Sequence, residues 1–194
     1  MPPPRSEAAR RAILTAALDL VEEASYEKLS IEGIAARAGV GKQTIYRWWP
    51  SKGAVLLDAL LALSEDQAGT LVPLPDTGDL EADLKLVMRA TVAELDDPRY
   101  DRPMRALTAA LLHDEALAAD YAERLEAPIT QIKLDRLRSA QAAGELRADV
   151  ELDVAVDLIW GPVMSRWLQR TGSLSPAFAD AVVASALSGL RRAG

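Results

Sequence analysis

The most informative part of the chain is residues 30–52, which read SIEGIAARAGVGKQTIYRWWPSK. Ser30 stands before apolar residues at helical spacing and is a favoured N-cap residue. Gly39 suits the left-handed conformation in which many helices end. A second short helix is predicted over 41–49, because Pro50 cannot continue it. Two short helices joined by a glycine-containing turn are typical of a helix-turn-helix, whose second helix enters the major groove of DNA.

The second helix of this pair is predicted to have an apolar side and a polar side. We expect Val40, Ile45 and Trp49 in the core of the head, which is the N-terminal part of the chain, residues 1–50. Adjacent helical positions point about 100° apart, so only one of two neighbouring tryptophans can bury fully. The outward residues suit DNA, because Lys pairs readily with guanine and Gln with adenine, whereas hydroxyls, an indole N–H and a lysine can hold phosphates. They are Lys42, Gln43, Thr44, Tyr46, Arg47, Trp48 and, just beyond the helix, Lys52. A simple packing role is the alternative for Tyr46.

The uneven distribution of charge bears on a DNA-binding role. The net charge of −7 by itself argues against a nucleic-acid partner, because DNA affinity rests on Lys and Arg neutralising phosphates. Residues 1–52 nevertheless hold eight basic and six acidic side chains, and residues 33–57 hold four basic side chains and no acid. A locally basic segment on an acidic body is expected where one end of a protein meets DNA. A solvated basic face without function is the alternative.

The whole chain is predicted to be all-α. Aromatic residues make up only 5% of it and no Asn-Gly or Asp-Gly hairpin turn occurs, while Ala, Leu, Glu and Arg dominate. Helical spacing and breaks predict further helices over 6–24, 51–68, 80–95, 103–112, 114–143 with a bend at Pro128, 149–170 and 175–192. Residues 1–50 then form a three-helix head, and residues 51–194 form a connector helix followed by a helical C-terminal domain.

The helix-turn-helix residues resemble the N-terminal signature of the TetR family of transcriptional repressors. The resemblance is carried by the pattern S-I-x-x-I-A-x-x-A-G-V-x-x-x-T-I-Y-x-x-W-P-S-K over residues 30–52, and it extends over about residues 10–60. It implies an all-helical homodimer whose two heads read a palindromic operator. It also implies a C-terminal domain that dimerises and binds a small-molecule effector, which releases the DNA. The C-terminal part itself matches only in length and helical pattern.

The resemblance also implies DNA-binding roles for individual residues. Base reading would fall to Lys42, Gln43 and Arg47, and contacts with the DNA backbone to Ser30, Thr44, Tyr46, Trp48 and Lys52. The sequence departs from the family pattern where Gly41 replaces a commoner Ser, Trp49 stands where Phe is usual, and Gly53 replaces a frequent Glu. The glycine at position 41 weakens the cap of the second helix and so the prediction of its first residue.

The C-terminal domain offers candidate residues for the effector and for the dimer. Its large apolar residues, with a few polar ones, suit a small-molecule pocket and would equally suit a core. The effector candidates are Met88, Arg89, Tyr100, Met104, His113, Tyr121, Trp160, Met164 and Trp167. In the family the last two helices meet their symmetry mates as a four-helix bundle, and small residues in these helices suit close packing. The dimer candidates are Val154, Leu158, Val183, Leu187 and Leu190.

Two other classes of function compete with this interpretation. An enzyme would need a nucleophile with a base, a metal cluster or a cofactor loop. The chain has one His, no Cys and neither GxGxxG nor GxSxG, so we predict no catalytic residue, metal or cofactor, although paired carboxylates stay open. His113 is predicted to be a helix C-terminal or pocket residue rather than a general base. A constitutive DNA-binding protein without an effector is disfavoured, because residues 51–194 exceed what dimerisation alone needs.

The sequence shows no feature of secretion or membrane insertion. The N-terminus has no apolar stretch of signal-peptide length, and the longest uncharged run, 181–190, is ten residues, far short of the ~20 that a membrane helix needs. The absence of Cys suits a reducing compartment. We therefore expect a cytoplasmic protein whose partners are double-stranded operator DNA, a small-molecule effector and a second copy of itself, with no membrane contact.

Overall fold

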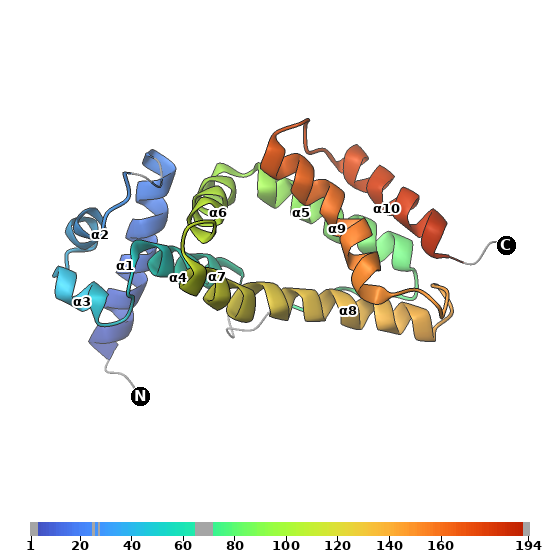
Figure 1. Ribbon diagram of the computed structural model, residues 1–194, viewed down its shortest axis with the longest axis horizontal. Helices are drawn as coiled ribbons and strands as arrows, with labels where there is room; N and C mark the ends of the chain where they lie inside the picture. The colour runs from blue at the N-terminus through green and yellow to red at the C-terminus, as the bar shows by residue number, and fades with distance from the viewer. Residues whose placement is uncertain (1–3, 25, 27, 65–71, 192–194) are drawn as a thin grey trace. The chain divides into compact units, whose positions relative to one another are not determined.

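The computed structural model, drawn in Figure 1, describes residues 4–24, 26, 28–64 and 72–191 of the 194-residue chain. Within these residues the chain forms helices and no strand, which confirms the all-α prediction. The helices are α1 (Pro4–Glu23), α2 (Ile31–Ala38), α3 (Lys42–Tyr46), α4 (Lys52–Ser64), α5 (Leu80–Asp96), α6 (Pro98–Leu111), α7 (Glu115–Tyr121), the π-helical turn η1 (Ala122–Glu126), α8 (Ala127–Ala142), α9 (Leu152–Gln169) and α10 (Pro176–Leu190).

Local capping signals place several helix ends where the sequence predicts them. The hydroxyl of Ser30 accepts a hydrogen bond from the backbone N–H of Gly33 (3.1 Å), and Ser175 accepts one in the same way from Phe178 (3.2 Å). Gly39 ends α2 with a φ of 67°, in the left-handed region. These caps satisfy backbone groups that have no partner inside a helix. The starts of α2 and α10 are therefore set by residues next to them in sequence.

Other helix boundaries differ from the predicted ones. The third helix ends at Tyr46, short of the predicted 49. The sixth begins at Pro98, whereas the prediction placed its start at 103. Proline is well tolerated at the first helical position, because the N–H that it lacks would have no partner there. The predicted end of the connector helix at 68 lies outside the described residues, and α4 is described as far as Ser64.

The predicted long helix over 114–143 is interrupted before Pro128. It runs as α7, then as the π-helical turn η1, then as α8. Proline has no N–H to donate, and its ring clashes with the carbonyl four residues earlier. That carbonyl belongs to Arg124, inside the π-helical turn. The predicted irregularity is therefore present, and it takes the form of a π-helical turn on the N-terminal side of the proline.

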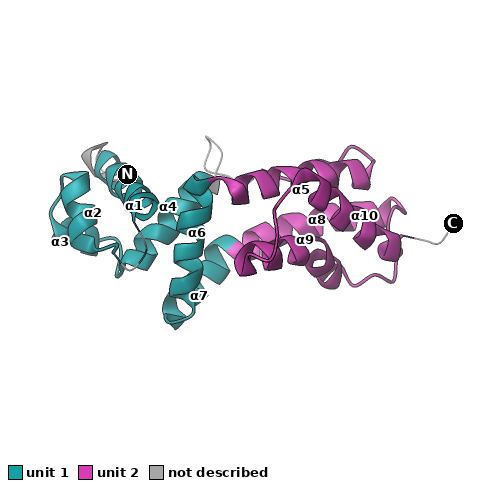
Figure 2. Ribbon diagram, turned by 90° about the horizontal axis from the view of Figure 1, so that it is seen from above, with its two compact units in different colours: residues 1–71, 98–125 teal, residues 72–97, 126–194 magenta. Residues whose placement is uncertain are grey.

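The chain divides into two compact units, coloured separately in Figure 2. Unit 1 comprises residues 1–71 and 98–125, and unit 2 comprises residues 72–97 and 126–194. In unit 1, α1 packs against α2, α4 and α6, and α4 packs against α7. The helix-turn-helix thus shares its compact unit with α6 and α7. The predicted boundary at residue 50 lies inside unit 1, so it is not a boundary between the compact units. A division of functions at this residue stays a prediction.

In unit 2, α5 packs against α10 and α9, and α8 packs against α9. A charge lies inside this unit: the side chain of Arg136 on α8 is only 2% exposed. It donates hydrogen bonds to the carboxylate of Asp83 (2.9 Å) and to the carbonyl of Pro75 (2.9 Å). The same carboxylate accepts hydrogen bonds from the backbone and the hydroxyl of Thr77. This network fixes the segment that leads into α5.

Candidate nucleic-acid interface

The turn between α2 and α3 is built by the backbone. The N–H of Gly39 reaches the carbonyl of Ala36 (3.3 Å), and the N–H of Val40 reaches that of Ala35 (3.0 Å). These two bonds close the C-terminus of α2 and redirect the chain. The next helix starts after Gly41, whose backbone carbonyl accepts from Thr44 (2.9 Å) and which offers no side-chain cap. The helix-turn-helix geometry follows from these local bonds.

The third helix has the two sides that the sequence predicts. Ile45 is fully buried and Trp49 nearly so, which confirms the choice of Trp49 as the buried tryptophan. Trp48 is half-buried, and its ring meets that of Trp49 edge to face at 5.4 Å. Tyr46 is 55% exposed, so it is not a core packing residue. Lys42, Gln43 and Arg47 are exposed as well, and Thr44 is half-buried.

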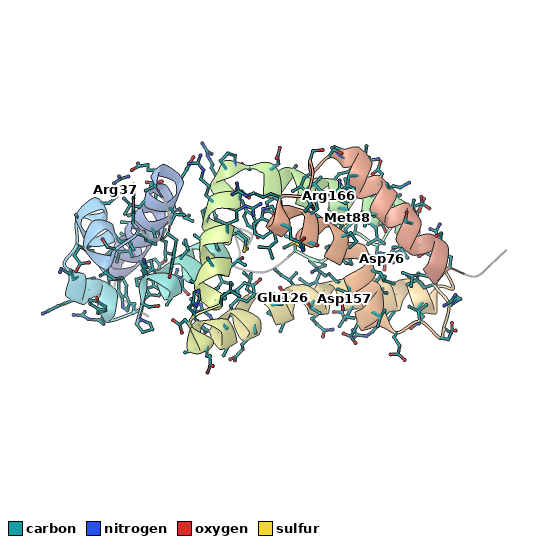
Figure 3. The ribbon with its side chains drawn as sticks, turned by 45° about the horizontal axis from the view of Figure 1, so that its top comes forward. Arg37, Asp76, Met88, Glu126, Asp157 and Arg166 are labelled. Carbon is teal, nitrogen blue, oxygen red and sulfur yellow. The ribbon has the colours of Figure 1, made fainter. Side chains whose placement is uncertain are left out.

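Two ion pairs lie on the surface of α2 and α3. The ammonium of Lys42 donates to the carboxylate of Glu32 at 2.7 Å. Arg37, which Figure 3 labels on α2, pairs with Glu23 through two bonds of 2.9 and 2.6 Å. The hydrogen bond and charge of Glu32 raise the pKa of Lys42, and the hydrogen bond of Lys42 lowers the pKa of Glu32. The lysine is therefore charged at neutral pH, and DNA would have to compete with Glu32 for it.

Lys52 has structural partners that its sequence position does not suggest. Its ammonium donates to the carbonyls of Tyr26 (2.8 Å) and Leu29 (2.9 Å), and it lies 4.3 Å from the centre of the Tyr26 ring. These contacts tie the first turn of α4 to the segment between α1 and α2. Two of the three N–H groups of the lysine are used in this way. Its contact with a DNA phosphate stays a prediction.

Sequence reasoning missed a carboxylate behind residues 41–49, which we call the recognition segment. Asp58, on α4, accepts a hydrogen bond from the indole Nε1 of Trp49 at 2.9 Å. Its other oxygen accepts from Arg124 of η1 at 2.6 Å, and Arg10 of α1 donates at 3.4 Å to the oxygen that binds the indole. A signal was present, because Asp58 interrupts the apolar run from Ala54 to Leu63. The identity of its partners could not be read from that signal.

A cavity of about 490 Å³ opens in unit 1 beside the end of the recognition segment. Its walls include both neighbouring tryptophans and residues of α4, α7 and η1. Three carboxylates and one guanidinium line it, from Asp58, Asp114, Asp120 and Arg124. Each carboxylate already accepts a hydrogen bond within the chain.

The nine candidate effector residues are divided between the two units. Tyr100, Met104, His113 and Tyr121 belong to unit 1, and Met88, Arg89, Trp160, Met164 and Trp167 belong to unit 2. Both tryptophans and the methionines of α5 and α6 are buried, whereas the histidine and the methionine of α9 are exposed. Arg89 lies on the surface, where it pairs with Asp180 of α10 (2.7 and 2.6 Å). An effector role for any of these residues stays a prediction.

Unit 2 also contains a half-buried basic group that sequence reasoning missed. The ammonium of Lys133 on α8 lies 5.1 Å from the centre of the Trp160 ring. Burial lowers the pKa of Lys133, and the negative charges of Glu126 and Asp157, both labelled in Figure 3, oppose that shift. A lysine held over an indole face is a cation–π contact. It places a positive charge next to a candidate effector residue.

The dimer candidates fall into two groups. Val154 and Leu158 on α9 are 55% and 49% exposed. Val183, Leu187 and Leu190 are instead buried within the protomer, on the side of α10 that packs against α5 and α9. These three side chains are therefore occupied inside unit 2. Of the five candidates, only the two on α9 are exposed, and a dimer role for any of them stays a prediction.

Over the described part of the chain, no helix has both the length and the apolar character needed to cross a membrane. In the same residues, no group of three or more His, Cys, Asp or Glu side chains is arranged to hold a metal ion.

Comparisons with known proteins cover both parts of the chain. The family model described as bacterial regulatory proteins, tetR family, matches residues 13–59, and that described as tetracyclin repressor-like, C-terminal domain, matches residues 74–186. The HTH-type transcriptional regulator YdeS of Bacillus subtilis is 34% identical over 189 residues, covering 97% of this chain and 92% of that protein. The DNA-binding transcriptional repressor TetR of Mycobacteroides abscessus is 31% identical over 193 residues, covering 98% of this chain and 97% of that protein.

Solved structures agree with these matches. The crystal structure of the TetR family transcription regulator SCO0332 has a TM-score of 0.75 and 34% identity, and the match covers 95% of this chain and 99% of that one. A TetR transcriptional regulator from Agrobacterium tumefaciens shares the fold with a TM-score of 0.72 at 20% identity, over 94% of each chain. The likeness thus extends to the C-terminal part, which the sequence pattern alone left unassigned.

Proposed function

The chain belongs to the TetR family of DNA-binding transcriptional regulators, and from this premise we propose that it is a homodimeric repressor which a small-molecule effector releases from a palindromic operator. The family is one of regulators and not of enzymes. The observation that carries the proposal is the two-sided α3, which buries Ile45 and exposes Lys42 and Gln43. The name of the relative from Mycobacteroides abscessus favours repression over activation.

We assign base reading to Lys42, Gln43 and Arg47. All three are exposed on the recognition segment, and their donors match acceptors on guanine and adenine in the major groove. Contacts with the DNA backbone are assigned to Ser30, Thr44, Tyr46, Trp48 and Lys52. The hydroxyl of Ser30 accepts from the backbone inside the head and keeps its own proton for a phosphate. Phosphate contacts fix the register of the head, and base contacts supply the sequence preference.

We place the dimer contact on the exposed face of α9. Val154, Leu158 and Leu168 each expose about half of their surface, and positions 161 and 165 continue their stripe with Gly and Ser. Residues at alternating spacings of four and three share one helix face. Small residues in that face let a second helix approach closely. A two-fold axis would bring the face against its own copy.

The dimer is tested by charging this face. In the variant V154E/L158E, unpaired carboxylates would have to be buried between the two copies, so sedimentation should show folded monomers. The control is Leu86→Glu, which charges an equally exposed leucine on α5 and should leave the dimer intact. Leu187→Glu is unsuitable, because that side chain is buried within the protomer and its replacement should unfold unit 2. A persistent V154E/L158E dimer would place the interface elsewhere.

We place effector binding in the part of the chain that matches the C-terminal family model. Unit 2 holds the buried indoles of Trp160 and Trp167 and the buried thioether of Met88. Apolar walls with a few polar groups are typical of small-molecule sites. Lys133 would supply a polar group of this kind, because its ammonium lies over the ring of Trp160. An effector releases DNA only through its preference for the arrangement that does not bind DNA, with a typical coupling of about 1–3 kcal/mol.

The DNA part of the proposal is tested by selection. The full-length protein would be used to enrich duplexes from a random library, and the enriched DNA would be sequenced. We expect a palindrome whose half-sites are one helical turn apart, ~34–36 Å, or a multiple of it. Enrichment of single half-sites, or of no sequence at all, would contradict the proposal.

The effector part is tested with the selected operator. A metabolite and antibiotic library would be screened for compounds that raise the melting temperature and also release the operator. Linkage requires that operator DNA weaken the binding of such a compound by the same factor. If no compound does both, the protein is a constitutive DNA-binding protein and the effector proposal is wrong.

A further inference from the structure

Asp58 links the recognition segment to helices outside the helix-turn-helix. It is only 8% exposed, yet none of its hydrogen bonds comes from its own helix. One oxygen holds the indole of Trp49 at the end of the recognition segment, and the other holds Arg124 of η1. A buried carboxylate is stable only when its oxygens are paired. The position of the tryptophan and that of the arginine therefore depend on the same group.

A second contact joins α7 to the first turn of α4. A Cβ placed on Gly53 would lie 2.6 Å from Cδ2 of Leu117 and 3.2 Å from the hydroxyl of Tyr26. Leu117 is held there because Asp114, the N-cap of α7, accepts a hydrogen bond from its backbone N–H (3.0 Å). A side chain at position 53 would therefore have to displace the tip of the Leu117 side chain. The glycine thus lets Leu117 of α7 lie directly against the first turn of α4.

The cavity beside Trp48 and Trp49 shows that this junction is not closely packed throughout. Its walls come from the end of the recognition segment, from α4, and from α7 with its N-cap and η1. α4 is joined to α7 by Leu117 at Gly53 and to η1 by Asp58 with Arg124. Because open space lies next to these contacts, loss of one of them can shift the recognition segment without unfolding the unit.

We propose that Asp58 is the positioning residue of the DNA-binding head and that Arg124 and Gly53 make the placement of the recognition segment depend on α7. The inference rests on the proposed DNA-reading role of α3 and adds how that helix is held. It assigns to η1 a specific task, which is to present a guanidinium to the carboxylate behind Trp49. It also predicts that the link acts on DNA affinity more than on folding.

The first test removes the charge of Asp58 and keeps its shape. Asp58→Asn retains an oxygen for the indole of Trp49 but loses the ion pairs with Arg124 and Arg10. We expect operator affinity to fall by about tenfold, with a much smaller change in melting temperature. Arg124→Gln should also lower the affinity, and the double variant should lose no more than Asp58→Asn alone, because both substitutions break the link between Asp58 and Arg124. Arg124→Lys should keep most of the affinity.

The matched control is Asp120→Asn. This residue pairs with the same guanidinium at 3.1 Å but does not hold Trp49, so operator affinity should change less than about twofold. Additive losses for Asp58→Asn and Arg124→Gln, or an unchanged affinity in both, would overturn the inference. If the unaltered protein selects no DNA, the failure belongs to the proposed function instead.

The second test uses Gly53. Alanine is the better helix former, so Gly53→Ala would be neutral or stabilising if α7 did not lie against α4. With Leu117 in place, the added methyl should displace the tip of this leucine, loosen the contact between α4 and α7 and weaken operator binding several-fold. The variant G53A/L117A removes the clash and should recover affinity relative to G53A. Affinity for the selected operator that is unchanged in G53A, or not recovered in G53A/L117A, would overturn the role of this contact.

Discussion

Each compact unit holds a network of carboxylates and guanidinium groups, and the two networks differ in exposure. In unit 2, Arg136 and Asp83 are 2% and 4% exposed and bind backbone as well as each other. In unit 1, Asp58 is mostly buried, but its partner Arg124 is 41% exposed. An arginine that reaches solvent loses less on leaving its partner than a buried one does, and Asp58 would keep its bonds from Trp49 and Arg10. The network in unit 2 is thus a fixed part of the fold, and that in unit 1 is adjustable.

This difference matches what each network holds. Arg136 fixes the segment that leads into α5, and we assign no DNA contact to that segment. Asp58 holds Trp49, at the end of the segment to which we assign DNA reading. A regulator needs a stable body and a head that can change its DNA affinity. We infer that the partly exposed pair of Asp58 and Arg124 lies where a change of conformation can alter DNA affinity. The buried pair of Asp83 and Arg136 lies where the fold has to stay fixed.

The largest expected effect comes from breaking the buried network. Arg136→Met should lower the free energy of unfolding by about 3–5 kcal/mol, because Asp83 would be left as an uncompensated buried charge. Arg124→Gln should cost less than about 1 kcal/mol, because its guanidinium is partly solvated. Urea unfolding followed by circular dichroism measures both. Equal losses in the two variants would remove the distinction between a fixed and an adjustable network.

A second expected effect is the acid sensitivity of the buried network. Burial raises the pKa of Asp83, but hydrogen bonds from Thr77 and Arg136 lower it by a larger amount, so the net shift of this pKa is downward. A carboxyl whose pKa is depressed in the folded state stabilises the protein above its unfolded value of about 3.9, and this stabilisation is lost as the pH falls through the folded pKa. The melting temperature should therefore fall more steeply as the pH is lowered below about 4.

The variant Asp83→Asn isolates this contribution. It should be less stable than the unaltered protein at pH 7 and should show a flatter loss of stability in acid. Asp135→Asn removes an exposed acid that pairs with Arg138, and it should leave the acid profile unchanged. The same acid profile for Asp83→Asn and the unaltered protein would show that this network does not set the acid limit.

Much of the head could be predicted from sequence because its structure is decided locally. The caps at Ser30 and Gly39 act on backbone groups a few residues away, and the spacing within 41–49 separates Ile45 from the exposed donors. The two-sided recognition segment follows from such short-range rules. The partners of Asp58 do not, because Arg124 lies 66 positions further along the chain.

The dimer candidates show a different limit. α9 and α10 carry apolar side chains on more than one face, so spacing alone does not tell which face meets the protomer and which remains free. Leu187 is buried and Leu158 is exposed, although both sit in similar apolar stretches. The decision depends on how α5 packs against α10, which is a contact between segments far apart in sequence.

The smallest expected effect concerns the exposed ion pair of Lys42 and Glu32, on the surface to which we assign DNA contact. Glu32→Gln frees Lys42 and removes a negative charge near the phosphates, so operator affinity should rise by about two- to fivefold at low salt. The gain should vanish at high salt, because exposed charges are screened. The variant E32Q/K42A should show no gain over K42A. A decrease in affinity for E32Q would indicate that the pair orients the lysine instead of competing with DNA.

The central claim, that α3 reads the operator, is tested most directly by comparing the DNA sequences selected by variant heads. Lys42→Ala and Gln43→Ala should each lose discrimination at one base pair per half-site, on the order of tenfold or more, and keep it elsewhere. Tyr46→Phe should weaken binding to all sequences alike, as expected for a lost phosphate contact. Selection of the same operator with the same stringency by the unaltered protein, K42A and Q43A would contradict the claim.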